Sequence, residues 1–113
     1  LAEQGIDFQF ETYGLDVHKR IPVDVRQNIY LVLKEAVNNI AKYAQASMVT
    51  ITLHNENNRF SMRISDNGQG LSAAKRLTGQ GMHNMKMRAD RIGGMVEFIE
   101  DNGLTVMLTR DAL

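Results

Sequence analysis

The sequence contains no cysteine, which excludes a disulfide framework and a thiolate metal site. Its 13 Lys and Arg residues equal its 13 Asp and Glu residues, and this balance argues against a chain that mainly neutralises nucleic-acid phosphates. No apolar run approaches the roughly 18 residues needed to cross a bilayer, and no signal peptide opens the chain. With 113 residues, of which 43% are hydrophobic, the expectation is one small soluble α/β domain spanning residues 1–113.

Two hydrophobic patterns predict the first elements. Apolar residues alternate with polar ones at Ile6, Phe8 and Phe10, which predicts a half-buried strand. Pro22 is the only proline, and its fixed φ suits the first turn of a helix. From residue 23 to about residue 46, apolar residues recur every three or four positions, which predicts one long helix with an apolar stripe.

The rest of the chain reads as two hairpins separated by a glycine-rich segment and a second helix. Strands are predicted over 49–53 and 60–64, joined by the turn residues 55–58, and over 95–100 and 104–109, joined by an Asn-Gly turn. A helix is predicted over 82–92, ended by Gly93 and Gly94. The expected order is strand, helix, strand, strand, helix, strand, strand.

A polar stripe marks the long predicted helix. Glu35, Asn39 and Lys42 are four and three residues apart and fall within one narrow arc of an α-helix. A solvated helix face is one interpretation. Asn38 and Asn39 weaken it, because asparagine competes with the backbone for hydrogen bonds in a helix interior. A carboxylate, a carboxamide oxygen and an ammonium on one face suit a hydrated Mg²⁺ and the phosphates it bridges.

Two glycine clusters follow the second hairpin strand. The first, Asp66-Asn67-Gly68-Gln69-Gly70, is compatible with a tight turn, but it exceeds what a two-residue hairpin needs. An aspartate at the end of a buried strand is also able to accept a hydrogen bond from an exocyclic amine such as that of adenine. Glycines beside it allow close approach of the base.

The second cluster, Gly79-Gln80-Gly81, stands directly before a helix, where unpaired N–H groups and the helix dipole favour an anion. Asn84 stands where a dinucleotide fingerprint has its third glycine, and no P-loop motif occurs. Between the clusters, residues 71–78 are small, polar and basic, with Lys75 and Arg76. They form either a lid over a ligand or a surface loop.

Taken in order, these pieces resemble the ATP-binding catalytic domain of bacterial sensor histidine kinases, in the superfamily shared with gyrase, Hsp90 and MutL. Residues 29–44 are similar to the family's asparagine box, 66–70 to its first glycine box and 79–85 to its second. The resemblance implies a two-layer α/β (α+β) sandwich, with helices on one face of a mixed, largely antiparallel sheet. It covers nearly the whole chain.

The resemblance also implies roles for single residues. Asn39 would ligate Mg²⁺, Glu35 would orient or deprotonate the attacking group, and Asp66 would bind the adenine amine. The remaining implied nucleotide-binding residues are Lys42, Tyr43, Gly68, Gly70, Gly79, Gly81 and Met82. One departure from the family pattern is Leu104, which stands where the closing strand usually has threonine.

The implied cofactors are ATP and Mg²⁺, and the implied enzyme is a protein histidine kinase that acts in two-component signal transduction. Its partners would be a histidine-bearing dimerisation domain and a DNA-binding response regulator, with no nucleic-acid or direct membrane contact by this domain, in the cytoplasm. No histidine here has the setting of a phosphorylated one, so the acceptor would be separate. An anti-sigma-type serine kinase or ATPase, and a degenerate module that binds no nucleotide, remain alternatives.

Overall fold

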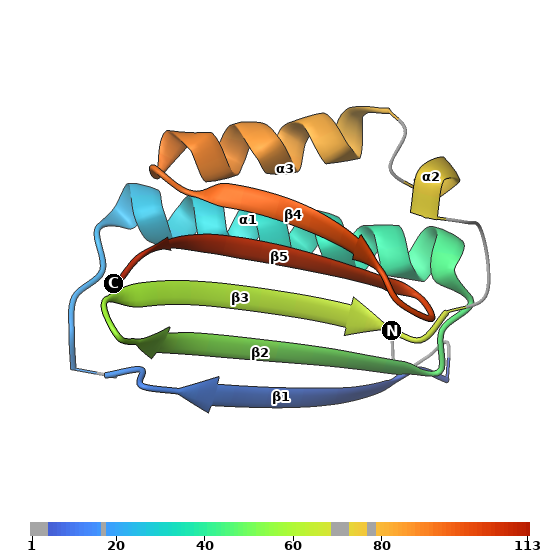
Figure 1. Cartoon of the computed structure of the whole chain (residues 1–113), viewed down its shortest axis with the longest axis horizontal. Coiled ribbons are helices and arrows are strands. Elements are labelled where there is room, and N and C mark those ends of the chain that lie inside the picture. The colour runs from blue at the N-terminus through green and yellow to red at the C-terminus, as the bar shows by residue number, and fades with distance from the viewer. Residues whose placement is uncertain (1–4, 17, 69–72, 77–78) are drawn as a thin grey trace.

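The computed structural model describes residues 5–16, 18–68, 73–76 and 79–113. The elements, labelled as in Figure 1, are β1 (Asp7–Tyr13), α1 (Val23–Asn39), the π-helix η2 (Ile40–Ala44), β2 (Met48–Glu56), β3 (Arg59–Asp66), α2 (Ala73–Arg76), α3 (Gln80–Arg91), β4 (Met95–Glu100) and β5 (Leu104–Asp111). The predicted order of strands and helices is confirmed, and η2 and α2 are additions to it. Within these described residues, no helix is both long enough and apolar enough to cross a membrane.

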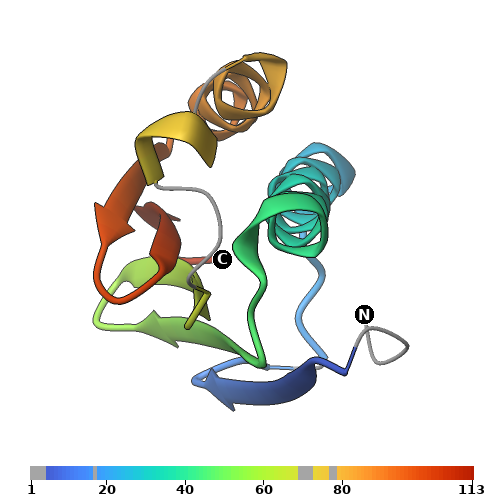
Figure 2. The same cartoon turned by 90° about the vertical axis from the view of Figure 1, so that its right-hand side faces the viewer.

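The molecule has two layers. One five-stranded sheet has the order β1-β2-β3-β5-β4, in which β1 runs parallel to β2 and the other neighbours are antiparallel. Helices α1 and α3 lie side by side on one face of this sheet (Figures 1 and 2). The predicted sandwich with a mixed, largely antiparallel sheet is therefore confirmed.

Both hairpin turns follow from their residues. Asn57 and Asn58, between β2 and β3, have φ values of 55° and 63°. The turn between β4 and β5 places Asn102 at φ 51° and Gly103 at φ 137°. Asparagine and glycine tolerate positive φ better than other residues, so they favour the turns that match the twist of paired strands.

The core lies between the two layers. The apolar stripe of α1 faces the sheet, as the spacing predicts, and α3 adds a second buried row. The largest fully buried side chains are those of Phe60, Met62, Ile64, Leu108, Val32 and Val49. Together they hold the ends of α1, β3 and β5 in fixed relative positions.

The burial of β1 differs from the prediction. Ile6 is buried, but Phe8 and Phe10 are 42% and 61% exposed. Their register partners on β2, Val49 and Ile51, are buried, so the apolar side of β1 lies on the helix-bearing face of the sheet but at its edge. A strand at this edge extends beyond the cover that the helices provide (Figure 2).

The long helix also differs from the prediction. Its α-helical part ends at Asn39, and the next five residues, Ile40–Ala44, form a π-helix that ends at Gln45 with φ 51°. A π-helix bonds residue i to i+5, so the α-helical period does not continue past Asn39. The arc predicted to contain Glu35, Asn39 and Lys42 therefore holds only for the first two residues.

Candidate functional site

Asp66 is the last residue of β3, and backbone groups fix its buried carboxylate. Its Oδ1 accepts the N–H of Gly68 at 2.9 Å and the N–H of Leu104 at 3.4 Å. A Cβ at position 103 would lie 2.0 Å from the Asp66 carbonyl oxygen, so only glycine lets the start of β5 approach this closely. The carboxylate is thus held at the meeting point of β3 and β5.

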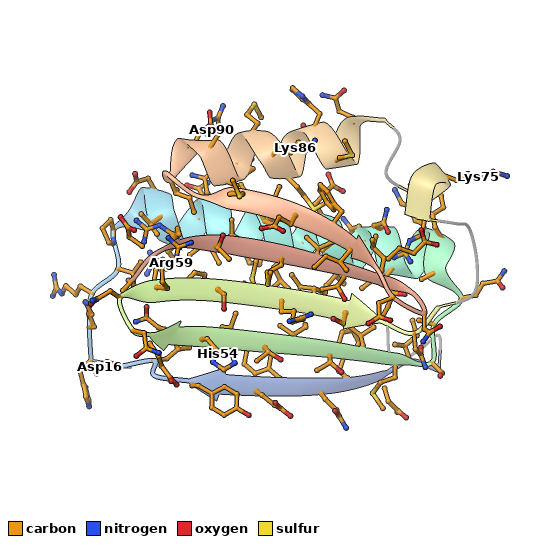
Figure 3. The ribbon with its side chains drawn as sticks, viewed as in Figure 1. Asp16, His54, Arg59, Lys75, Lys86 and Asp90 are labelled. Atoms are coloured by element: carbon orange, nitrogen blue, oxygen red, sulfur yellow. The ribbon has the colours of Figure 1, made fainter. Side chains whose placement is uncertain are left out.

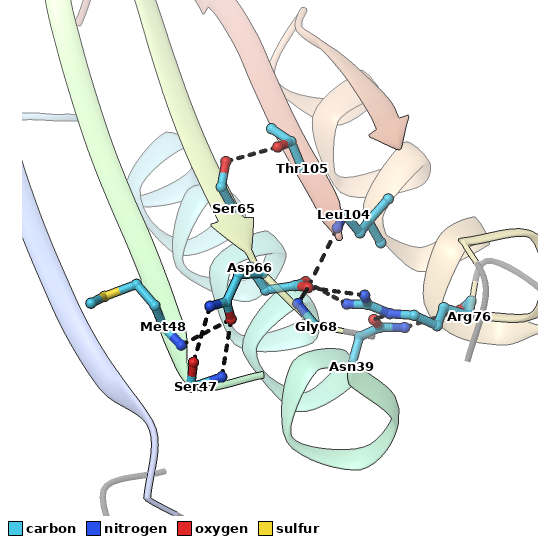
Figure 4. Close-up of polar contacts among 10 residues, drawn as sticks. Asn39, Ser47, Met48, Ser65, Asp66, Gly68, Arg76, Leu104 and Thr105 are labelled. Carbon is cyan, nitrogen blue, oxygen red and sulfur yellow. Dashed lines mark hydrogen bonds and ion pairs between the residues drawn. The ribbon is translucent and has the colours of Figure 1, made fainter. Parts of the chain in front are cut away.

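Arg76, from α2, completes the partners of Asp66 (Figure 4). Its Nη1 donates to Oδ1 at 3.2 Å and its Nη2 donates to Oδ2 at 2.7 Å, while the two side chains are only 2% and 1% exposed. Bidentate bonds between a guanidinium and a carboxylate are among the strongest polar contacts in proteins. In the sequence, Arg76 is recognisable only as part of a basic segment, which gives no sign of this role.

Asn39, the last residue of α1, holds the same arginine. Its Oδ1 accepts the Nε–H of Arg76 at 2.8 Å, and its Nδ2 donates to the Arg76 carbonyl oxygen at 3.0 Å. Asn39 and Asp66 are 27 positions apart in the sequence, yet both contact one guanidinium. Their polar atoms therefore face a common space at the junction of α1 and η2, a place where π-helical turns often mark function.

The described glycines of the two clusters shape this region. A Cβ at position 68 would lie 2.1 Å from the carbonyl oxygen of Ala44, so the first cluster packs directly on the end of η2. A Cβ at position 81 would lie 3.4 Å from Cδ of Glu35. Gly79 has φ 88°, a conformation that favours glycine. Gly70 lies outside the described residues.

A comparison with protein families identifies the domain. Residues 24–112 match the model of the family described as "Histidine kinase-, DNA gyrase B-, and HSP90-like ATPase". The chain belongs to this ATPase family. The matched segment runs from the second residue of α1 to the end of β5 and includes Asn39, Asp66 and Arg76.

Curated relatives of this ATPase-family domain are sensor kinases. It is 32% identical over 108 residues to the sensor histidine kinase YxjM of Bacillus subtilis, covering 93% of this chain and 26% of the relative. It is 28% identical over 102 residues to the sensor histidine kinase LiaS of Bacillus subtilis, covering 89% of this chain and 27% of the relative. The chain thus spans about a quarter of the length of these relatives.

Solved structures share its fold. The blue-light activated histidine kinase of Erythrobacter litoralis EL346 superposes with a TM-score of 0.77 at 17% identity, over 93% of this chain and 35% of that one. The catalytic domain of the histidine kinase ThkA superposes with a TM-score of 0.76 at 21% identity, over 98% and 82% of the two chains. The arrangement of sheet and helices is therefore that of histidine kinase catalytic domains.

The other predicted site residues of the ATPase-family domain lie around this centre. Glu35, one helical turn before Asn39, lines a groove of about 220 Å³ between α1 and α3, opposite Asn84 and Arg88. Lys42 and Tyr43 are exposed on η2, and Met82 is partly buried in the first turn of α3. The structure thus links Asn39 and Asp66 through the guanidinium of Arg76, and Gly68 through its bond to Asp66.

Two residues beside the site have structural tasks. The Asn67 Oδ1 accepts the backbone N–H groups of Ser47 and Met48, each at 3.0 Å, and so ties the end of β3 to the start of β2. Leu104, at the family's threonine position, is buried and contributes its backbone N–H to Asp66. The next residue, Thr105, makes a hydroxyl contact of 2.8 Å with Ser65.

Proposed function

We propose that this domain binds Mg-ATP between Asn39 and Asp66 and supplies the γ-phosphoryl group to a histidine on a separate dimerisation domain. One observation carries the proposal: a single guanidinium bonds both side chains, so their oxygens face one buried space, filled by that group, and accept N–H donors there. Membership of the ATPase family supports nucleotide binding in this place. The printed names of the relatives support a sensor kinase as the parent protein.

The Asp66 end of this space suits an adenine base. An ionised carboxylate only accepts hydrogen bonds, and an exocyclic amine only donates them in this geometry. Gly103 keeps a side chain away from the carboxylate, since a Cβ there would lie 2.9 Å from Asp66 Oδ1. Backbone N–H groups hold Asp66 in place, so its position does not depend on the ligand.

The Asn39 end suits a metal-bound triphosphate. A carboxamide oxygen is a hard ligand of the kind Mg²⁺ prefers, and Mg²⁺ keeps several waters. Among the described residues no three His, Cys, Asp or Glu side chains come together, so phosphate and water oxygens would complete the coordination. Bound Mg²⁺ supplies charge neutralisation for phosphoryl transfer.

Glu35 is the proposed general base or orienting group. It lies one turn before Asn39 and lines the groove between α1 and α3, and a Cβ at position 81 would be in van der Waals contact with its carboxyl group. The imidazole nitrogen of the acceptor would form the new P–N bond as the bond to the ADP oxygen breaks, and Glu35 would take the imidazole proton. Lys42, at the margin, would add positive charge near the phosphates.

The proposed partners are the histidine-bearing dimerisation domain of the parent kinase and its response regulator, within the cytoplasm. The acceptor would be another segment or chain, because no histidine among residues 1–113 has the helical setting of a phospho-acceptor. Residues 1–113 would form the single catalytic and ATP-binding domain.

Calorimetry with Mg-ATP tests the site. Asn39→Ala is expected to lower the affinity at least tenfold and to remove its dependence on Mg²⁺, because the carboxamide ligand is lost. Asn38→Ala, the exposed neighbour on α1, is the matched control and should bind within about threefold of the wild type, a difference under about 0.7 kcal/mol. Equal Mg²⁺-dependent affinity in the Asn39 variant would refute the metal role.

A transfer assay tests the acceptor. The domain is mixed with a histidine-bearing dimerisation fragment and radiolabelled ATP. Label that is lost in acid and retained in base indicates phosphohistidine and supports the proposal. Label that survives acid indicates phosphoserine and favours the serine kinase instead.

A further inference from the structure

We propose that Arg76 is an internal competitor for the nucleotide, a regulation of the site that rests on the proposed function. Its guanidinium occupies the positions on Asp66 and Asn39 that the base and the metal would use. The nucleotide-free domain is therefore held in a self-blocked state. Binding of ATP requires that this one side chain leave.

The guanidinium of Arg76 contacts both oxygens of the buried Asp66 carboxylate. An ionised carboxylate offers about four lone-pair positions. Oδ1 accepts three N–H groups, from the backbone of Gly68 and Leu104 and from Nη1 of Arg76, whereas Oδ2 accepts one, from Nη2 of Arg76. The Asp66 side chain is only 1% exposed and the backbone donors belong to the fold itself, so an incoming amine reaches the carboxylate only where the guanidinium now lies.

The Asn39 end is blocked in the same way. Its carboxamide oxygen, the proposed metal ligand, is bonded to the Nε–H of Arg76 at 2.8 Å. A guanidinium is permanently charged, so it repels a divalent cation at this oxygen as well as occupying it. The second bond, from Asn39 Nδ2 to the Arg76 carbonyl oxygen, fastens the backbone of α2 to the end of α1.

The block depends on one arginine of a short helix. α2 has four residues, and within it Arg76 is buried while its neighbour Lys75 is exposed and extends outward (Figure 3). The fraction of molecules in which the site is open sets the expected change in nucleotide affinity. A site that is open in about 1–10% of molecules shows an apparent affinity about 10- to 100-fold below its intrinsic value.

The test compares Mg-ADP affinities of the wild type, Arg76→Ala and Arg76→Lys by calorimetry. We expect Arg76→Ala to bind about 10- to 100-fold more tightly than the wild type. Arg76→Lys should be intermediate, because one ammonium cannot bond both carboxylate oxygens and Asn39 together. The matched control is Arg59→Ala, which removes an exposed arginine at the opposite end of β3 (Figure 3) and should leave the affinity unchanged.

The outcomes separate the competitor from the proposed function. Equal or weaker binding by Arg76→Ala refutes the competitor and leaves the nucleotide site standing. Absence of binding by the wild type and by both Arg76 variants refutes both proposals. Tight binding by an Arg76 variant with little binding by the wild type supports both.

A second measurement covers the case in which Arg76→Ala fails to fold. The side-chain Nε–H signal of Arg76 is followed by NMR in the wild type and is assigned by its loss in Arg76→Lys. Saturating Mg-ADP should shift it strongly, because the bond to Asn39 breaks. An unchanged signal at saturation would overturn the competitor.

Discussion

The buried contact between Asp66 and Arg76 should contribute far more to stability than the exposed contact between Arg59 and Asp111, although both involve a residue at an end of β3. The first pair has a nearest distance of 2.7 Å and side chains that are 2% and 1% exposed. The second has a distance of 3.9 Å and side chains that are 61% and 92% exposed. Identical substitutions in the two pairs therefore compare a buried, bidentate contact with an exposed, longer one.

The magnitude follows from the contacts. Each charge-assisted hydrogen bond contributes about 1.5–3 kcal/mol, and the bidentate pair has one short and one longer bond, which gives a coupling of about 3 kcal/mol. Removing either partner alone leaves a buried charge and should lower the free energy of unfolding by about 3–5 kcal/mol. For the exposed pair, water and salt reduce the coupling to about 0–1 kcal/mol.

The assay is a double-mutant cycle by urea denaturation, followed by circular dichroism without nucleotide. One cycle contains Asp66→Asn, Arg76→Gln and their combination, and the control cycle contains Arg59→Gln, Asp111→Asn and their combination. The free energy of unfolding of the Asp66 and Arg76 double variant should exceed the sum expected from its single variants by about 3 kcal/mol. A coupling no larger than that of the control pair would show that Arg76 does not occupy the site in solution.

Two further pairs of substitutions test the packing around the site and at the sheet edge. Gly68→Ala should lower the free energy of unfolding by about 1–3 kcal/mol in urea denaturation, because its Cβ would lie 2.1 Å from a backbone oxygen of η2. Gly81→Ala should cost less, because its Cβ would lie at an ordinary 3.4 Å from Glu35 Cδ, and equal losses would contradict the close approach at Gly68. Phe60→Ala should cost about 3–5 kcal/mol and Phe10→Ala under about 1 kcal/mol in the same assay, since their side chains are 1% and 61% exposed; similar losses would mean that β1 is covered.

Local patterns in the sequence were sufficient to predict most of the fold. The apolar stripe of α1 and the turns around Asn57 and Asn102 depend on residues close in the chain, and the structure confirms them. The position of Asp66 at the end of a strand was also recognisable, because it belongs to a short motif with its own composition. Asn39 was instead expected in the interior of a longer helix, whereas α1 ends there.

Features that depend on contacts between residues far apart in the chain were not recognisable from the sequence. Arg76 meets Asn39 across 37 positions, and nothing in its own segment marks it as buried. The alternation at Phe8 and Phe10 predicts a strand correctly but contains no information on whether a helix covers it. The π-helix escaped notice because Ile40 and Ala44 are both buried and four residues apart, a spacing that an α-helix also produces.

β1 is an edge strand of the sheet, so its local stability can differ from that of the site. It is bonded to β2 alone, and its two phenylalanines retain much of their contact with water. Asp66 belongs to β3, which does not pair with β1 in the sheet. Asn39 and Arg76 belong to the helices α1 and α2. Transient fraying of the first strand would therefore leave the bonds among Asn39, Asp66 and Arg76 in place.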